Sequence, residues 1–403
     1  FFSHDGGGHW TQLEGQFPTI AVRDLAIQKQ ADDLVMATFG RGYWVLDDLA
    51  PLRQATPQVL GQNAHIFAPR DAVIYIPSSR LGGRGQAFQG AAYYEADNPP
   101  FGAEITYYLK SGIETREQKR HAEERKLRQA DQPVPYPSFQ EMRAEDQEQS
   151  PYLLFTITDD QGNVVRRLRA QPHAGMHRIT WDLRYPATTP VRLASNGGRG
   201  FGRGGMGPLV VPGTYHVSLD KVVNGVPSHL VDPVAFKVVP LNNATLGAQD
   251  KAALLAFQKQ AGELMGRIRA AGAELSEAAT RLRYIRAAIP LTPNAPDSLL
   301  AEARALQQRV DDLDIKLNGD RAVSRHQFET PPSISQRISS VVYASYSATA
   351  APGGAQKEQV RIAADEFQPV HAAIVKLMSD LDAFEARLKQ MGAPYTPGQP
   401  PSH

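Results

Sequence analysis

The feature that most constrains the fold is a change of hydrophobic period near residue 246. From there apolar residues recur at alternating steps of three and four, the spacing of one face of an α-helix. Three segments keep this spacing, at Leu254, Phe257, Ala261, Leu264, Ile268, Ala271, Leu275, Ala278, Leu282, Ile285 and Ile289, then at Leu299, Ala303, Leu306, Val310, Leu313 and Leu317, and finally at Ala363, Phe367, Val370, Ile374, Leu377, Leu381, Phe384, Leu388 and Met391. We therefore expect residues 246–403 to form an antiparallel three-helix bundle with a proline-rich tail; an intermolecular coiled coil is the alternative.

Residues 54–240 have a different period. Short apolar runs alternate with polar turns, as in "AEITYYLK", "YLLFTITD", "GMHRITWDL" and "GTYHVSLDKVV". This pattern predicts a β-sandwich of immunoglobulin or fibronectin-III type, with Trp181 in its core. A charged insertion at 111–150 interrupts it and has almost no apolar stripe, so we expect a solvated helix there, or alternatively an arm that docks a partner.

The N-terminal segment contains the spacing S-x-D-x-G-x-x-W, formed by Ser3, Asp5, Gly7 and Trp10. Asp5 can accept hydrogen bonds from backbone amides across a turn, and glycine permits the positive φ that such a turn requires. Three strand-like runs follow, at 21–27, 33–39 and 42–49. We expect them to form one antiparallel sheet, with Trp10 and Trp44 largely buried.

The S-x-D-x-G-x-x-W spacing resembles the Asp-box, or BNR repeat, of sialidase-like and sortilin-like β-propellers. Further segments, among them "DLVMATFGRGYWVLDDLAPLRQ", "NPPFGAEITYYLK", "GMHRITWDLRYP" and "QVRIAADEFQPV", resemble in order the landmarks of a bacterial family of large exported VPS10/sortilin-like proteins, often labelled "glycosyl hydrolase". The resemblance implies that residues 1–53 are the C-terminal blade of a propeller whose other blades lie upstream. The expected fold is thus mixed and multidomain: a propeller blade, a sandwich and a helical bundle.

Residues suited to catalysis are sparse. No nucleophile elbow, zinc-protease, P-loop or dinucleotide motif occurs, and the histidines are scattered. Asp47 and Asp48 are adjacent in a strand and point to opposite faces, so they cannot form the carboxylate pair of a glycosidase. Sialidases use arginines on their propeller strands, and Arg41 is the one candidate on this blade; a structural arginine at the blade edge is the alternative. We expect no catalytic residue, cofactor or metal here, and the Asp-box to be structural.

Composition limits the partners. The formal net charge is +1, which argues against nucleic acid, and no apolar run approaches the ~20 residues of a membrane span. The resemblance indicates an exported protein, although no signal peptide is present. We expect a non-catalytic region that serves binding, scaffolding or assembly, with the upstream propeller and a protein, peptide or glycan as partners. The alternative is an accessory region of a sialidase-like or other glycoside hydrolase whose active site lies in the upstream blades.

Overall fold

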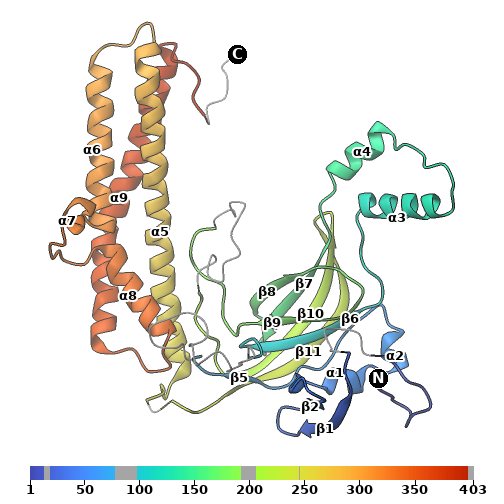
Figure 1. Ribbon diagram of the computed structural model, residues 1–403. Coiled ribbons are helices and arrows are strands. Elements are labelled where there is room, and N and C mark those ends of the chain that lie inside the picture. Colours follow the sequence, from blue (N-terminus) through green and yellow to red (C-terminus); the bar gives the residue numbers. More distant parts are fainter. Residues whose placement is uncertain (13–18, 78–97, 192–205, 245, 398–403) are drawn as a thin grey trace. The chain divides into compact units, whose positions relative to one another are not determined.

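The computed structural model describes residues 1–12, 19–77, 98–191, 206–244 and 246–397 (Figure 1). The chain forms two compact units. The first comprises Phe1–Arg184 and Val211–Asn243, and the second comprises Tyr185–Val210 and Ala244–His403. The first contains the sheets and the second contains the long helices, so the expected mixed class with a helical C-terminal region is confirmed. Within the described residues, no helix is both long and apolar enough to span a membrane.

The first sheet of the first unit has three antiparallel strands in the order β1-β2-β3. They are β1 (Val22–Gln28), β2 (Asp33–Thr38) and β3 (Tyr43–Leu46). Each lies where the alternating pattern predicts a strand. Two short helices follow, α1 (Ala50–Gln54) and α2 (Pro57–Leu60), and each begins with a proline in its first turn, where the missing N–H costs no hydrogen bond.

Two further sheets form the main core of this unit. The larger has the order β5-β11-β10-β7-β8 and the smaller β4-β6-β9. The larger contains β5 (Ala72–Ile74), β7 (Tyr152–Asp159), β8 (Val164–Ala170), β10 (Gly213–Val223) and β11 (Val226–Pro240). The smaller contains β4 (Ala64–Ile66), β6 (Ala103–Leu109) and β9 (Gly175–Trp181). Pairing is antiparallel except between β11 and β5.

Aromatic side chains connect these two sheets. The rings of Tyr107 on β6 and Phe155 on β7 lie 4.9 Å apart, and that of Trp181 on β9 lies 5.4 Å from Tyr215 on β10. Trp181 is fully buried, and its Nε1 donates a hydrogen bond to the Arg184 carbonyl at 3.0 Å. The prediction that Trp181 is a core residue is confirmed.

The charged insertion between β6 and β7 contains two helices, α3 (Arg116–Gln129) and α4 (Phe139–Asp146). Both begin with a capping box, formed by Thr115 with Gln118 and by Ser138 with Glu141, which satisfies the first free amides of each helix. Neither helix has a buried residue, as its charged sequence leads us to expect. The second helix was not predicted.

The described residues of the second unit form four substantial helices rather than three. They are α5 (Lys251–Ala288), α6 (Ser298–Asn318), α8 (Ile334–Tyr346) and α9 (Gly354–Gln390), with the short η1 (Ile289–Leu291) and α7 (Arg321–Arg325) between them. The predicted seams belong to α5, α6 and α9, and helix α8 was missed. Its buried face joins the same core, through Ile334, Ile338, Val341, Val342 and Tyr346.

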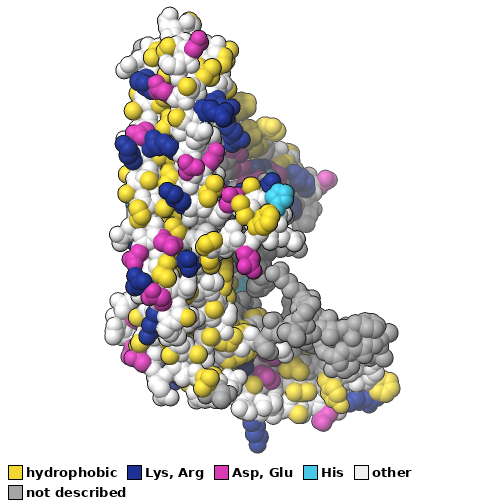
Figure 2. All heavy atoms as spheres, turned by 90° about the vertical axis from the view of Figure 1, so that its left-hand side faces the viewer, with side chains coloured by type: hydrophobic (Ala, Val, Ile, Leu, Met, Phe, Trp, Pro, Cys, Tyr) yellow, Lys and Arg dark blue, Asp and Glu magenta, His cyan; other side chains and the backbone are white. Residues whose placement is uncertain are grey.

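Side-chain pairs give the directions of these helices. Arg281 near the end of α5 pairs with Glu385 near the end of α9 at 2.7 Å, so α5 and α9 run the same way. Arg309 of α6 pairs with Asp380 at 2.7 Å, while Arg387 meets Glu302, so α6 runs opposite to α9. The end of α6 contacts the start of α8, and both lie along α5 (Figure 1). On the face seen in Figure 2, basic and acidic side chains are interspersed over the helices.

One boundary differs from the sequence prediction. Residues 185–191 and 206–210 fall within the predicted sandwich, yet they group with the helical unit. Thr188 Oγ1 donates to the Gly262 carbonyl of α5 at 2.5 Å, and Lys259 Nζ lies 3.8 Å from the centre of the Tyr185 ring. Helix α5 has glycine where this segment approaches, since a Cβ at Gly266 would lie only 2.3 Å from the Thr188 carbonyl oxygen. Residues 192–205, which include the glycine–arginine stretch, lie outside the described part of the chain.

Candidate functional site

The predicted Asp-box residues form a hydrogen-bonded turn. Ser3 Oγ donates to Asp5 Oδ1 at 2.7 Å and accepts from the Gly7 amide at 2.8 Å, and Asp5 Oδ1 also accepts from the His9 amide at 2.9 Å. Gly7 has φ +102°, which only glycine adopts without strain. These donors hold the pKa of Asp5 far below its ordinary value, the His9 amide contributing most. All the bonds of Asp5 close its own turn, as in a structural staple.

The prediction that Trp10 is largely buried is wrong. Its side chain is 64% exposed, and Trp44 on β3 is half-buried. The Trp10 ring packs against Gly7, where an added Cβ would lie 3.6 Å from it. One side of the ring therefore covers the turn, as the motif indicates, while the rest of the ring stays exposed.

The central rows of the sheet β1-β2-β3 are apolar on both faces, while Asp24, Gln28 and Asp33 lie toward the strand ends on one of them. In the strand register Leu25 faces Met36, which faces Trp44, so these three share one face. The next row, Ala26, Val35 and Val45, lies on the opposite face and is also apolar. Leu25 is 59% exposed and Val45 53% exposed, so each face carries uncovered apolar surface. A sheet with one solvated face normally alternates apolar with polar residues, and this one does not.

Arg41, the predicted face candidate, lies in the turn between β2 and β3 rather than on a strand. Gly40 and Gly42 beside it have φ of +83° and +65°. Arg41 is exposed, and within the part of the chain that the structure describes it has no hydrogen-bonded or ionic partner. The described residues therefore do not form the arginine cluster of a sialidase around Arg41. They also do not give Arg41 the bonds of a structural arginine at the blade edge.

A charged network that the sequence analysis missed joins the small sheet to the N-terminal sheet. Glu104 on β6 is 5% exposed and meets two guanidinium groups, Arg70 at 3.0 Å and Arg178 at 3.6 Å. Arg70 also donates to the Ala31 carbonyl at 3.2 Å, and Arg178 donates to the Asp47 carbonyl at 3.0 Å. The sequence feature that could have revealed this network is a glutamate within the apolar run "AEITYYL". The network is structural, because each arginine reaches a backbone carbonyl of the N-terminal segment.

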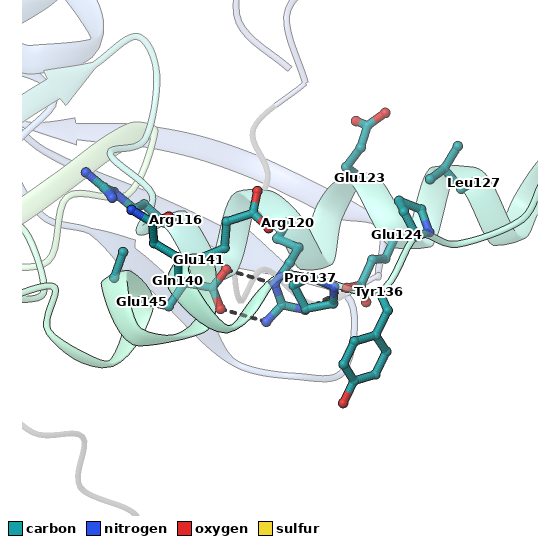
Figure 3. A pocket seen from close by; sticks show the side chains of 12 residues that line it. Arg116, Arg120, Glu123, Glu124, Leu127, Tyr136, Pro137, Gln140, Glu141 and Glu145 are labelled. Atoms are coloured by element: carbon teal, nitrogen blue, oxygen red, sulfur yellow. Dashed lines mark hydrogen bonds and ion pairs between the residues drawn. The ribbon is translucent and has the colours of Figure 1, made fainter.

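A cleft of about 610 Å³ lies between α3 and α4 (Figure 3). Its centre is Arg120, whose Nε and Nη2 donate to the two oxygens of Glu145 at 2.8 Å each, while Nη1 donates to Glu124 at 2.6 Å. Arg120 lowers the pKa of both carboxyls. A glycosidase needs one carboxyl whose raised pKa lets it donate a proton. Neither carboxyl here meets that requirement, and the ion pairs of Arg120 brace α3 against α4.

Metal and family evidence add no further assignment. Among the described residues, no group of three or more His, Asp or Glu side chains could hold a metal ion. Comparison with protein-family models and with curated proteins found no match. The features that remain for function are therefore the two-faced N-terminal sheet and the clefts of the charged arm.

Proposed function

We propose that this chain is the non-catalytic C-terminal region of an exported sortilin-like β-propeller protein, serving binding, scaffolding or assembly. In this proposal residues 1–53 are a propeller blade, 54–240 an immunoglobulin or fibronectin-III-like sandwich, and 246–403 an antiparallel helical bundle. The upstream propeller part of the same protein is the first partner. The observation that carries the proposal is the uncovered apolar surface on both faces of β1-β2-β3.

The two faces match what a propeller requires. Each blade packs between two neighbours, so both of its faces are buried and both must be apolar. A blade has four strands, and β1, β2 and β3 account for three of them. The Asp-box turn next to this sheet has the hydrogen bonds that its motif calls for. Together these features support a blade whose neighbours come from elsewhere in the protein.

The proposal of a non-catalytic role rests on the titratable groups. The acidic pair in the cleft between α3 and α4 has lowered pKa values, and Arg41 lies at an exposed turn. Neither arrangement supplies the general acid with a raised pKa that a glycosidase needs. Binding and assembly need only accessible surface and a stable scaffold.

The test compares this chain with the intact protein from which it comes. Ile27 on β1 is 48% exposed, and Val164 on β8 is a matched control at 52%. We expect Ile27→Asp to lower the Tm of the intact protein by several degrees, because neighbouring blades then bury a charge. Ile27→Asp should leave the Tm of this chain unchanged, and Val164→Asp should change the Tm of neither protein. The propeller proposal would be overturned if the intact protein had the same mass as this chain, 44.1 kDa. It would also be overturned if Ile27→Asp lowered the Tm of both proteins equally.

A second measurement addresses catalysis. Fluorogenic sialosides and neutral glycosides should show no turnover above buffer with this chain at any pH between 4 and 8. Turnover that survives further purification and disappears in one acidic variant would contradict the non-catalytic role.

A further inference from the structure

Helix α3 has a second face, which lines a second cleft. Gln118, His121 and Arg125 follow one another at steps of three and four, so they share one side of the helix. The cleft that they line has a volume of about 500 Å³, and its opposite wall is the connection between β8 and β9, residues 171–174, with His173. We call it the α3 cleft. It is distinct from the cleft between α3 and α4.

The walls of the α3 cleft are tied together by hydrogen bonds. The Ile113 amide donates to the Pro172 carbonyl at 2.9 Å, which joins the base of the arm to the opposite wall. The Arg116 amide donates to Glu148 at 2.6 Å, which joins the start of α3 to the segment before β7. His177 contacts the Ala174 carbonyl at 2.9 Å and steadies the connection between β8 and β9. A cleft whose walls are fixed in this way is preformed, which lowers the entropy cost of binding a ligand.

The arginines on the two faces of α3 differ in whether they form ion pairs. On the face toward α4, Arg120 and Arg128 are paired with Glu124. On the cleft face, Arg125 has no ion pair or hydrogen bond with any residue that the structure describes. Gln118 accepts from the Thr115 amide through its Oε1, and its NH₂ group has no acceptor among the described residues. The cleft thus holds nitrogen donors that its own residues leave unused.

Two histidines extend this donor set. His121 and His173 line the cleft with Arg125, and their imidazole rings add N–H groups to it. Three carboxylates face these histidines: Glu114 in the lining, and Glu124 and Glu145, which interact with His121 from the other face of α3. The ring of His177 lies 6.4 Å from that of His173. The lining thus holds one guanidinium group and two imidazole rings beside a single carboxylate, that of Glu114.

We propose that the α3 cleft binds a small molecule through a carboxylate or sulfate group, held by Arg125 together with the ring N–H groups of His121 and His173. Arginine offers paired N–H donors that match the geometry of such oxyanions, and charge-assisted hydrogen bonds of this type are the strong ones. The volume is large enough for a molecule of monosaccharide size. The site lies outside the apolar sheet faces, so it does not depend on the proposed propeller.

The test uses the full chain with histidine rings labelled for NMR, at pH 5.5. The probes are sodium sulfate, glucuronate and glucose, since the two sugars differ only in the carboxylate. We expect glucuronate, sulfate or both to move the ring resonances of His121 and His173 together in a saturable way, while glucose does not. Binding of sulfate alone assigns the site to free anions, and binding of glucuronate alone assigns it to an organic acid.

Arg125→Gln should weaken binding by roughly tenfold or more, since it removes the permanent charge. Arg128→Gln is the matched control, because Arg128 lies on the same helix but pairs with Glu124 at 3.0 Å. Far-UV circular dichroism of both variants should equal that of the parent, as α3 has no buried residue. The proposal is overturned if neither anion moves the two rings, if glucose moves them equally, or if both arginine variants bind alike.

Discussion

Glu104 lies on β6 among residues that are nearly all buried, and it is the one acidic side chain of that strand. Its charge is tolerated because Arg70 and Arg178 approach from two sides. A buried carboxylate without such partners would have to lose its charge or unfold the region. The two arginines are only partly buried, so solvent screens part of their attraction. At the residue scale, this network attaches the N-terminal sheet to the core formed by the other two sheets.

Glu104→Gln should lower the free energy of unfolding by about 1–3 kcal/mol, because it removes charge-assisted hydrogen bonds at a buried position. Urea unfolding of the first unit measures the loss. Glu123→Gln is the control, since Glu123 is well exposed and its single partner is 3.5 Å away. Equal stability of the two variants would show that the network contributes nothing.

His229 lies between two carboxylates of the β10–β11 hairpin, Asp232 at 3.0 Å and Asp220 at 3.1 Å, and both raise its pKa. Because the folded state favours protonated His229, its contribution to stability is complete below about pH 6.5 and is lost as the pH rises through the higher folded value. Asp232→Asn should lower the pKa of His229, and so should Asp220→Asn. Ring NMR against pH measures it, with His65, whose pKa burial lowers, as the reference that should not move. An unchanged His229 titration in both variants would refute the pairing.

At the scale of elements, the described helices differ in how readily the sequence predicts them. Helices α5, α6 and α9 carry long periodic seams, and the predicted seam residues are buried except Phe257 and Met391, which are partly buried. The structure also buries residues outside the predicted seams, namely Gln258, Gly262, Met265, Gly266, Ala288 and Val360. Helix α8 is short, follows two prolines and is rich in serine and β-branched residues, so its local signal is weak. It is helical because its apolar side packs on α5 and α9. A hydrophobic pattern that repeats over many residues predicts a helix from the sequence alone. A short helix such as α8 depends instead on its tertiary contacts.

The approach of residues 185–191 to α5 gives a prediction at this scale. Gly266→Ala places a Cβ 2.3 Å from the Thr188 carbonyl oxygen, so the segment must leave the helix. Hydrogen–deuterium exchange of peptides covering 185–191 should then rise while the ends of α5 stay protected.

Gly272→Ala is the control for that substitution, because its Cβ would meet its nearest neighbour, Leu317 Cδ2, at 3.7 Å. This change should add about 0.5–1 kcal/mol of stability through helix propensity alone. Unaltered exchange at 185–191 in Gly266→Ala would mean that this segment does not lie against α5.

At the scale of the whole molecule, the chain crosses between its two units three times, after Arg184, Val210 and Asn243. The sequence indicates a change of class near residue 246, but nothing in it shows that residues 185–210 belong with the helices. Their assignment depends on contacts with α5, such as Thr188 with Gly262, that join distant positions. The same distinction between local and tertiary features applies to the candidate functional site. The Asp-box turn is local and was predicted, whereas the exposure of Trp10 and the donors of the α3 cleft depend on tertiary contacts.

Ending the chain after Asn243 should leave the first unit folded, because its sheets have their own buried core. Far-UV circular dichroism should retain the β signal, and a cooperative urea transition should persist. Residues 185–191 should become sensitive to protease, since their partner helix is gone. Loss of the cooperative transition would show that the sheets need the helical unit to fold.

The docking of residues 185–191 on α5 also has a consequence for the order of events during synthesis. Thr188 leaves the ribosome well before Gly262 and Gly266, which receive it. At ~5–20 residues per second, the interval is on the order of ten seconds. During that time β9 can pair with β6, because both precede the segment. The segment itself has to wait, and a chaperone or protease that samples the nascent chain meets it before its partner exists.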